Sequence, residues 1–148
     1  VGEGADEIFS GYGLYSLMNK FNKLYFKPYS SLPTFLKKIG ISIGKNILSN
    51  SKQNYLRLAH DNKELFWGGA VVFNELEKEK LFNREKKYDT YSKIIDPFYR
   101  KYDKMNSNAS FIDRIIALDL HHRLPELLLM RTDKMAMATS VETRVPFY

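Results

Sequence analysis

The chain contains no cysteine among its 148 residues. Without thiols it cannot form a disulfide scaffold, use a cysteine nucleophile, or bind zinc or an iron–sulfur cluster through thiolates. The absence also fits a protein of a reducing compartment, so we expect a cytoplasmic location. Any chemistry must come from carboxylates, histidines, hydroxyls and cationic side chains.

Long hydrophobic runs are missing as well. The longest are 127–130 and 67–73, and the second contains two glycines. A membrane-spanning helix needs roughly 20 apolar residues, so we expect no membrane segment. No basic stretch followed by an apolar run opens the chain, so no signal peptide is predicted.

The two ends of the chain also lack the usual features of protein termini. The sequence opens on Val-Gly-Glu-Gly without an initiator methionine and stops at Val-Pro-Phe-Tyr without a polar tail. Its length allows one domain. We therefore expect residues 1–148 to be a single partial domain, a fragment of a longer protein.

The charge is unbalanced, with 23 basic against 17 acidic side chains and a formal net charge of +6. One interpretation is a lysine-rich solvated surface, and the other is attraction to polyanions such as nucleotide phosphates. The basic residues are scattered and accompany no nucleic-acid-binding motif. We therefore expect no nucleic-acid partner.

Helical signals dominate, and strand signals are nearly absent apart from the two ends, so the sequence predicts a mainly α chain. The clearest helix is expected over 110–123, where Ser110 and Asp113 have the spacing of a capping box. Two adjacent apolar stripes on this segment predict a deeply buried helix, one with Phe111, Ile115 and Leu118 and the other with Ile112, Ile116 and Leu120. The segment 140–147 has an extended pattern instead.

Prolines and glycines predict interruptions of the other helices. Pro28 and Pro33 are expected to break the helical pattern of residues 16–62. The helix that follows Pro33 is expected to stop near Gly40 and Gly44.

Two further prolines fall in helical patterns. Pro97 is expected to split the helix predicted over 89–105. Pro125 is expected to end the helix over 110–123 and to open the next one, which would run toward Ala138, since proline suits a first helical turn.

The first candidate constellation is Gly2-Glu3-Gly4-Ala5-Asp6-Glu7. Its glycines allow a ligand to approach the backbone, and the amides of a helix N-terminus favour anions. Carboxylates in such a place can hold Mg²⁺ that bridges phosphates. The alternative is a capped turn whose acidic residues complement the helix dipole.

The second constellation consists of Arg131, Asp133 and Lys134, followed by Glu142 and Arg144. These charges interrupt an otherwise apolar region, where charged groups are normally paired. They indicate either a structural ion-pair network or a polar pocket for a zwitterionic or phosphorylated ligand. The residues alone leave both readings open.

A metal site built on histidine is not expected. His121 and His122 are adjacent, and neighbouring residues of a helix project about 100° apart, so the two rings cannot readily share a metal.

The two ends carry a family resemblance. Residues 1–12, Val-Gly-Glu-Gly-Ala-Asp-Glu-Ile-Phe-Ser-Gly-Tyr, closely resemble the G-E-G-[AS]-D-E-[LIV]-F-G-G-Y signature of glutamine-hydrolysing asparagine synthetases. Residues 124–147 resemble a second signature of that family, L-P-x-x-L-L-x-x-D-x-x-[ST]-M-A-x-S-x-E-x-R-x-P-F-L-D. Close resemblance covers about 36 residues, and the order of the motifs makes the whole chain fit.

The resemblance implies a fold and a reaction. The chain would be the middle-to-late, helical portion of an α/β adenine-nucleotide α-hydrolase-like domain, of the PP-loop ATP pyrophosphatase type. In that family the domain uses ATP and Mg²⁺ to adenylate the side-chain carboxylate of aspartate. Ammonia from a separate glutaminase domain then gives asparagine, AMP and pyrophosphate. A homodimer is a further expectation.

The resemblance also implies roles for individual residues. Glu3 matches the position tied to catalysis, as a base or orienting group, and Gly2 and Gly4 provide the close backbone approach to the nucleotide. Asp6 matches a ligand of Mg²⁺ and pyrophosphate. Glu142 matches a pocket carboxylate that can pair with the Glu3 side of the site.

The remaining charged residues of the second motif receive supporting roles. Arg144 is expected to anchor its segment by an ion pair. Arg131, Asp133 and Lys134 are expected either to support the pocket or to contact the ligand.

Several family features are not in this sequence. The phosphate loop S-G-G-x-D-S is missing, as is the glutaminase domain with its cysteine, and the family's essential lysine would fall beyond Tyr148. Ser10 replaces the first glycine of F-G-G-Y, and Tyr148 replaces the leucine of P-F-L-D. We therefore expect the isolated chain to be inactive.

Two other functions stay open at this stage. One is a synthetase-like paralogue that amidates another carboxylate, for example in surface-polysaccharide synthesis. The other is a noncatalytic helical interaction module. The carboxylates of Glu3, Asp6 and Glu142 argue for a catalytic protein.

Overall fold

The computed structural model describes residues 2–82 and 89–146, and the first residue of the first motif and the last two of the chain lie outside this range. Within it the chain is helical and contains no strand, which confirms the mainly α prediction. The described part of 140–147 is irregular backbone. The elements are α1 (Ala5–Ile8), α2 (Gly13–Phe21), η1 (Asn22–Phe26), α3 (Lys27–Ser30), α4 (Thr34–Ile47), α5 (Asn50–His60), α6 (Glu75–Leu81), η2 (Tyr91–Ile95), α7 (Asp96–Met105), α8 (Phe111–His121), η3 (Leu124–Leu129) and α9 (Met130–Met137).

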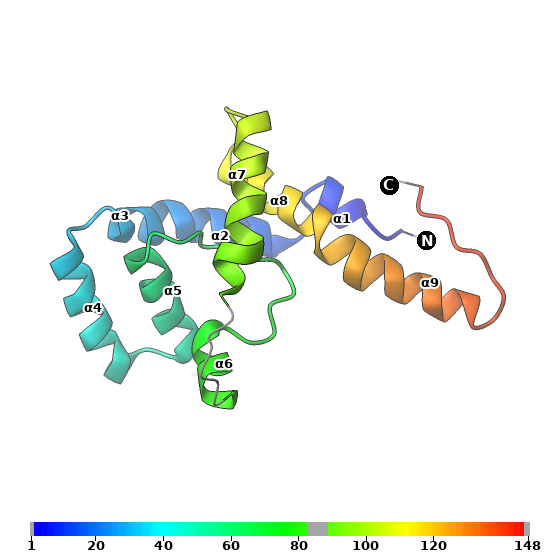
Figure 1. Cartoon of the computed structure of the whole chain (residues 1–148). Coiled ribbons are helices and arrows are strands. Elements are labelled where there is room, and N and C mark those ends of the chain that lie inside the picture. Colours follow the sequence, from blue (N-terminus) through cyan, green and yellow to red (C-terminus); the bar gives the residue numbers. More distant parts are fainter. Residues whose placement is uncertain (1, 83–88, 147–148) are drawn as a thin grey trace.

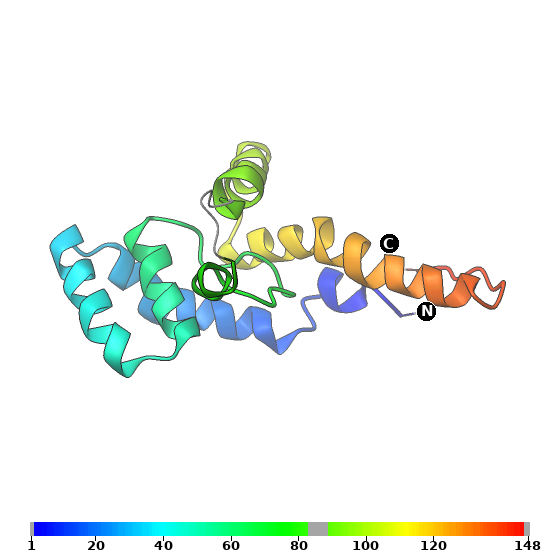
Figure 2. The same cartoon turned by 60° about the horizontal axis from the view of Figure 1, so that its bottom comes forward.

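The helices form an elongated arrangement (Figure 1). Helices α4 and α5 pack against each other at one end, and α1 and α2 pack on α8 in the middle. Helix α7 also packs on α8 and projects away from the rest, as Figure 2 shows. Helix α9 continues the direction of α8 to the other end. There the chain folds back along α9, so the first and last described segments lie close together in both views.

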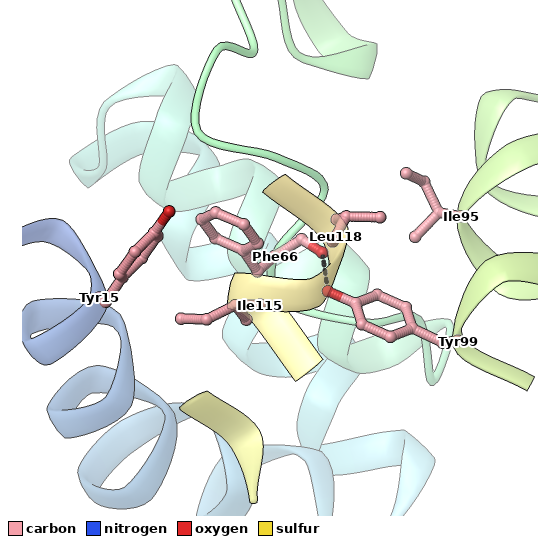
Figure 3. Packing of buried hydrophobic residues seen from close by; sticks show 6 residues of the cluster. All are labelled: Tyr15, Phe66, Ile95, Tyr99, Ile115 and Leu118. Carbon is pink, nitrogen blue, oxygen red and sulfur yellow. Dashed lines mark hydrogen bonds between the residues drawn. The ribbon is translucent and has the colours of Figure 1, made fainter. Parts of the chain in front are cut away.

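The core lies where α2, α7 and α8 meet the loop after α5. It consists of Tyr15, Phe66, Ile95, Tyr99, Ile115 and Leu118 (Figure 3). Ile115 and Leu118 are fully buried, as the apolar stripes of this helix predict. The Tyr99 hydroxyl donates a hydrogen bond of 2.9 Å to the Phe66 carbonyl oxygen, which satisfies a polar group that packing would otherwise strand. This core fixes α8, on which the first motif rests.

The capping box at the start of α8 is confirmed. The Ser110 hydroxyl accepts from the Asp113 amide at 3.3 Å, and the Ser110 amide donates to the Asp113 carboxylate at 2.8 Å. A second capping box, between Asn74 and Glu77, begins α6 and was not expected from the sequence.

Removing the cap of α8 should loosen its first turn. We expect Ser110→Ala to lower the free energy of opening of this turn by about 1 kcal/mol, because an amide loses its acceptor. Hydrogen exchange of amides 111–114 measures the change. Ser107→Ala, at an exposed position nearby, should shift it by less than about 0.5 kcal/mol. Equal effects of the two substitutions would contradict a capping role.

The predicted stop near Gly40 and Gly44 is wrong, because α4 runs through both glycines to Ile47. A Cβ at Gly40 would lie 2.6 Å from the Tyr29 hydroxyl, and one at Gly44 would lie 2.8 Å from a methyl carbon of Leu56. These glycines allow neighbouring side chains to approach the helix. The break at Pro33 is confirmed, since Pro33 is the N-cap of α4.

The expectation for Pro125 is confirmed, because α8 ends at His121, Pro125 lies at the start of η3, and helical backbone then runs through α9 to Met137. The expected breaks at Pro28 and Pro97 are wrong, because helical backbone continues past each of these prolines. Each of the two lies two residues after a π-helical segment, respectively η1 and η2. Proline lacks an amide hydrogen and crowds the carbonyl four residues earlier. A wider π turn accommodates the ring, so the chain bends without ending the helix.

Candidate functional site

The first motif forms a tight turn that leads into α1. Gly4 is buried and has φ 87° and ψ −14°, a left-handed conformation that glycine adopts without steric cost. Glu3 before it is half-buried, and Asp6 in the first helical turn is exposed. The predicted glycine-rich loop entering a helix is confirmed, and it holds two carboxylates near the helix N-terminus.

The end of this motif also depends on backbone freedom. The Gly11 amide donates to the Asp6 carbonyl at 2.8 Å, and the Asp6 side chain lies so close to Gly11 that a Cβ there would overlap it. Ser10 has φ 58°, a left-handed conformation that costs a non-glycine residue roughly 1 kcal/mol. Ser10 thus differs from the family signature at a position where glycine would be unstrained.

The second motif begins on α9 and continues into irregular backbone. Arg131, Asp133 and Lys134 are exposed on α9. Between residues 2–82 and 89–146, no ion pair joins these three side chains to one another or to the first motif. The structural ion-pair network that the sequence left open therefore does not include these three side chains in the described part of the chain.

Arg144 pairs with Glu142 of its own segment, so its expected role as an anchor of that segment stays a prediction. Arg144 Nε lies 3.6 Å from Glu142 Oε1, and both side chains are exposed, by 86% and 74% respectively. An exposed pair of this kind contributes about 0–1 kcal/mol, so it adds little to the stability of the fold. The segment lies at the same end of the molecule as the first motif (Figure 1), and the described residues show no hydrogen bond between Glu142 and Glu3.

A buried polar cluster beneath the first motif was missed by the sequence analysis. It consists of Glu7, Tyr12, Tyr15, Asp119 and Arg123. Glu7 and Asp119 are only 1% and 0% exposed. The signal that could have found it is Asp119, an acid on the apolar face of α8, with Arg123 one turn later.

Two hydrogen-bond donors hold the Asp119 carboxylate, one from the loop after α5 and one from α2. The Gly69 amide donates to Oδ1 at 2.7 Å and the Tyr15 hydroxyl to Oδ2 at 2.8 Å. Burial nevertheless raises the pKa of Asp119 above its usual 3.8, despite these bonds, and the nearby Glu7 carboxylate acts in the same direction. Burial and the hydrogen bond to Asp119 likewise raise the pKa of Tyr15.

The raised pKa of Asp119 gives the protein a measurable pH dependence. The folded state binds the Asp119 proton more tightly than the unfolded state does. The resulting stabilisation is fully present below pH ~3.8 and is lost as the pH rises through the folded-state pKa. Relative to Asp119→Asn, the wild type should become more stable as the pH falls from 7 toward 4. Hydrogen exchange of α8 amides in both proteins measures this difference, and a constant difference would contradict it.

Few of the described side chains could bind a metal ion. No cluster of three potential ligands occurs in residues 2–82 and 89–146. The rings of His121 and His122 both pack edge-on against Phe98, so they serve packing. The exposed Asp6 carboxylate fits Mg²⁺, which commonly binds one or two carboxylates together with substrate phosphates and waters.

Comparison with known proteins agrees with both motifs. The sequence profile of the family described as asparagine synthase matches residues 1–148. The chain belongs to the asparagine synthase family. The resemblance inferred from the two end motifs is thereby confirmed over the whole length.

The relatives are long proteins. An asparagine synthetase (glutamine-hydrolysing) of Bacillus subtilis is 29% identical over an alignment of 148 positions, which covers 99% of this chain and 22% of that relative. A protein of Mycobacterium tuberculosis, provisionally named as the same enzyme, is 27% identical over 99% of this chain and 21% of its own length. The chain thus spans about a fifth of these asparagine synthase relatives. No solved structure gave a significant match. Among the described helices, none is long and apolar enough to cross a membrane.

Proposed function

We propose that the protein containing this chain is an ATP-dependent amidotransferase, an asparagine synthetase that hydrolyses glutamine. The observation that carries the proposal is the turn at Gly4, which holds Glu3 and Asp6 beside the N-terminus of α1. Membership of the asparagine synthase family supports it. Residues 1–148 would be one partial domain, the helical portion of a PP-loop ATP pyrophosphatase domain, and inactive alone.

The proposed reaction has two steps. A side-chain carboxylate oxygen of aspartate attacks the α-phosphorus of ATP, and pyrophosphate leaves as the acyl-adenylate forms. Ammonia, released from glutamine by a separate domain, then attacks the acyl carbon, and AMP leaves with the bonding electrons. The attacking nitrogen loses a proton as asparagine forms. The first step needs the negative charge on the departing pyrophosphate to be stabilised. The second step also needs a proton acceptor for the attacking nitrogen.

The residues of the first motif would divide this work. Glu3 is the base or orienting group, because it is a half-buried carboxylate at the turn. The backbone at Gly2 and Gly4 lets the nucleotide approach. Asp6 would bind Mg²⁺, which neutralises charge on the departing pyrophosphate.

The second motif would complete the pocket. Glu142 supplies a further carboxylate on the same side of the molecule, paired with Arg144. Arg131, Asp133 and Lys134 project from α9 and would support the pocket or contact the ligand. The proposal includes a cytoplasmic enzyme that acts as a homodimer, without nucleic-acid partners.

The test is the exchange of labelled pyrophosphate into ATP by the full-length protein with Mg²⁺. Exchange that requires aspartate supports the proposal. Exchange with another carboxylic acid would keep the mechanism and change the substrate, as for a paralogue in surface-polysaccharide synthesis. No exchange with any acid tested would favour a noncatalytic helical module.

A further inference from the structure

Helix α1 is too short to hold its own shape. It has four residues, Ala5–Ile8, and a single turn fixes many dihedral angles for few hydrogen bonds. Its geometry must therefore come from tertiary contacts. Helix α1 packs on α8, and Glu7 is the buried residue on this turn.

Glu7 controls the direction of its neighbours. Adjacent residues on a helix project about 100° apart. With Glu7 directed inward, Asp6 is directed to solvent, as its exposure shows. Gly4, the N-cap of the same turn, places Glu3 just before it. Fixing the Glu7 side chain thus fixes the rotation of the turn that presents both Glu3 and Asp6.

The contacts of Glu7 come from two other segments. The Tyr12 hydroxyl donates to Glu7 Oε1 at 2.9 Å. Arg123 Nη1 lies 3.7 Å from the same oxygen, and the Arg123 guanidinium stacks over the Tyr12 ring at 4.4 Å from its centroid. Tyr12 and Arg123 therefore both contact the same oxygen of the Glu7 carboxylate.

Arg123 also connects Glu7 to the core. Its Nη1 lies 3.8 Å from Asp119 Oδ2, and Asp119 is held by the Gly69 amide and the Tyr15 hydroxyl. A Cβ at Gly69 would lie 2.7 Å from Asp119 Oδ2, so only glycine lets this loop approach so closely. The chain of contacts runs from the first motif through α8 to the loop after α5.

Two buried carboxylates, those of Glu7 and Asp119, face one guanidinium, whose Nε is buried and has no hydrogen-bond partner in the described structure. A neutral side chain in place of Glu7 would leave Asp119 and Arg123 paired with each other. It would also remove the attraction between the Glu7 carboxylate and Arg123, which holds this side chain of α1 inward. The rotation of α1 would then be fixed less firmly.

We propose that Glu7 is a positioning residue for the carboxylate-adenylating site, and that its interaction with Arg123 and Asp119 fixes the turn bearing Glu3 and Asp6. The expected effect on kcat rests on the proposed function. The dependence of the turn on the Glu7 charge does not, and amide exchange measures it separately.

The test uses Glu7→Gln in the full-length protein. Glutamine keeps the shape and the acceptor for Tyr12 but removes the charge. We expect kcat for aspartate-dependent asparagine formation to fall about 10- to 10²-fold, the scale of a small misplacement of catalytic groups. KM for ATP should change less than about threefold. Amides 8 and 9, which donate to Gly4 and Ala5, should exchange at least about tenfold faster.

The matched control is Glu64→Gln. Glu64, in the loop after α5, forms an ion pair of 2.7 Å with Arg114, which lies on α8 as Asp119 does. Both side chains of this pair are partly buried. Its loss should leave kcat and the exchange of amides 8 and 9 unchanged. Because Arg123 carries the coupling, adding Arg123→Gln to Glu7→Gln should reduce kcat by much less than Arg123→Gln does alone.

Each outcome decides the proposal. Unchanged exchange of amides 8 and 9 in Glu7→Gln overturns it, whether or not the protein is active. Equal effects of Glu7→Gln and Glu64→Gln on kcat would reduce Glu7 to a structural role and also overturn it. If the wild type is inactive with every acid tested, the proposed function fails, and faster amide exchange in Glu7→Gln alone would still establish that Glu7 fixes the turn.

Discussion

Replacing Glu3 by glutamine in the full-length protein is expected to lower asparagine formation by roughly 10²- to 10⁴-fold, the usual contribution of a positioned acid or base. Glutamine has the same shape but cannot accept the proton that the attacking nitrogen loses. The half-buried position of Glu3 beside the left-handed Gly4 argues that the fold tolerates the change. Assays of asparagine formation and of pyrophosphate exchange together separate amine attack from adenylation.

Two further substitutions test whether the effect of Glu3→Gln is specific. Asp6→Asn should reduce pyrophosphate exchange strongly and weaken the response to Mg²⁺, because a neutral amide is a poorer ligand for a hard cation. Glu126→Gln removes an exposed carboxylate of η3 at a variable position of the second motif, and its activity should match the wild type. Wild-type activity in Glu3→Gln would remove Glu3 from the catalytic machinery.

The largest expected effect on stability comes from Leu118. Its side chain is fully buried in the cluster that joins α2, α7 and α8. Leu118→Ala should lower the free energy of opening of α8 by about 3 kcal/mol, from lost apolar burial and the cavity left behind. Hydrogen exchange of α8 amides in the full-length protein measures this change.

Leu127 offers a matched control for Leu118. It lies in η3 and is 42% exposed. Leu127→Ala removes the same atoms from a site that water already reaches, so the loss should stay below about 1 kcal/mol. Comparable losses for the two substitutions would mean that the cluster around Leu118 does not hold α8 in place.

Local patterns in the sequence predicted the parts of the fold that depend on neighbours along the chain. The capping box of Ser110 and Asp113 needs only a three-residue spacing, and the helix start after Gly4 needs only glycine and acidic residues. The apolar stripes likewise identified Leu118 as core. These features are decided within one or two turns of helix.

Features that depend on distant segments were not predictable in this way. Gly40 is typical of a helix stop when only the sequence is known, but in the structure it gives room to Tyr29, which packs against the helix. Pro97 predicts a break in the helix, but in the structure the π turn before it accommodates the ring. The buried cluster joins Glu7 to Asp119, which is 112 positions later in the printed sequence, and no local rule links the two. The site residues themselves came from a family resemblance, because three carboxylates beside two glycines also fit a simple capped turn.

The segment η3 sets a fixed phase between two parts of the site. It separates Arg123, in the buried cluster, from Asp133 on the outer helix α9. Its i→i+5 turns hold one residue more than an α-helical turn does, so a deletion of one residue here converts the segment to α-helix and keeps the direction of α9. A one-residue insertion in the straight α-helix of α9 has no such outlet and rotates the residues beyond it by about 100°. Alignments and chimaeras of this segment should therefore place a one-residue gap in η3 rather than in α9.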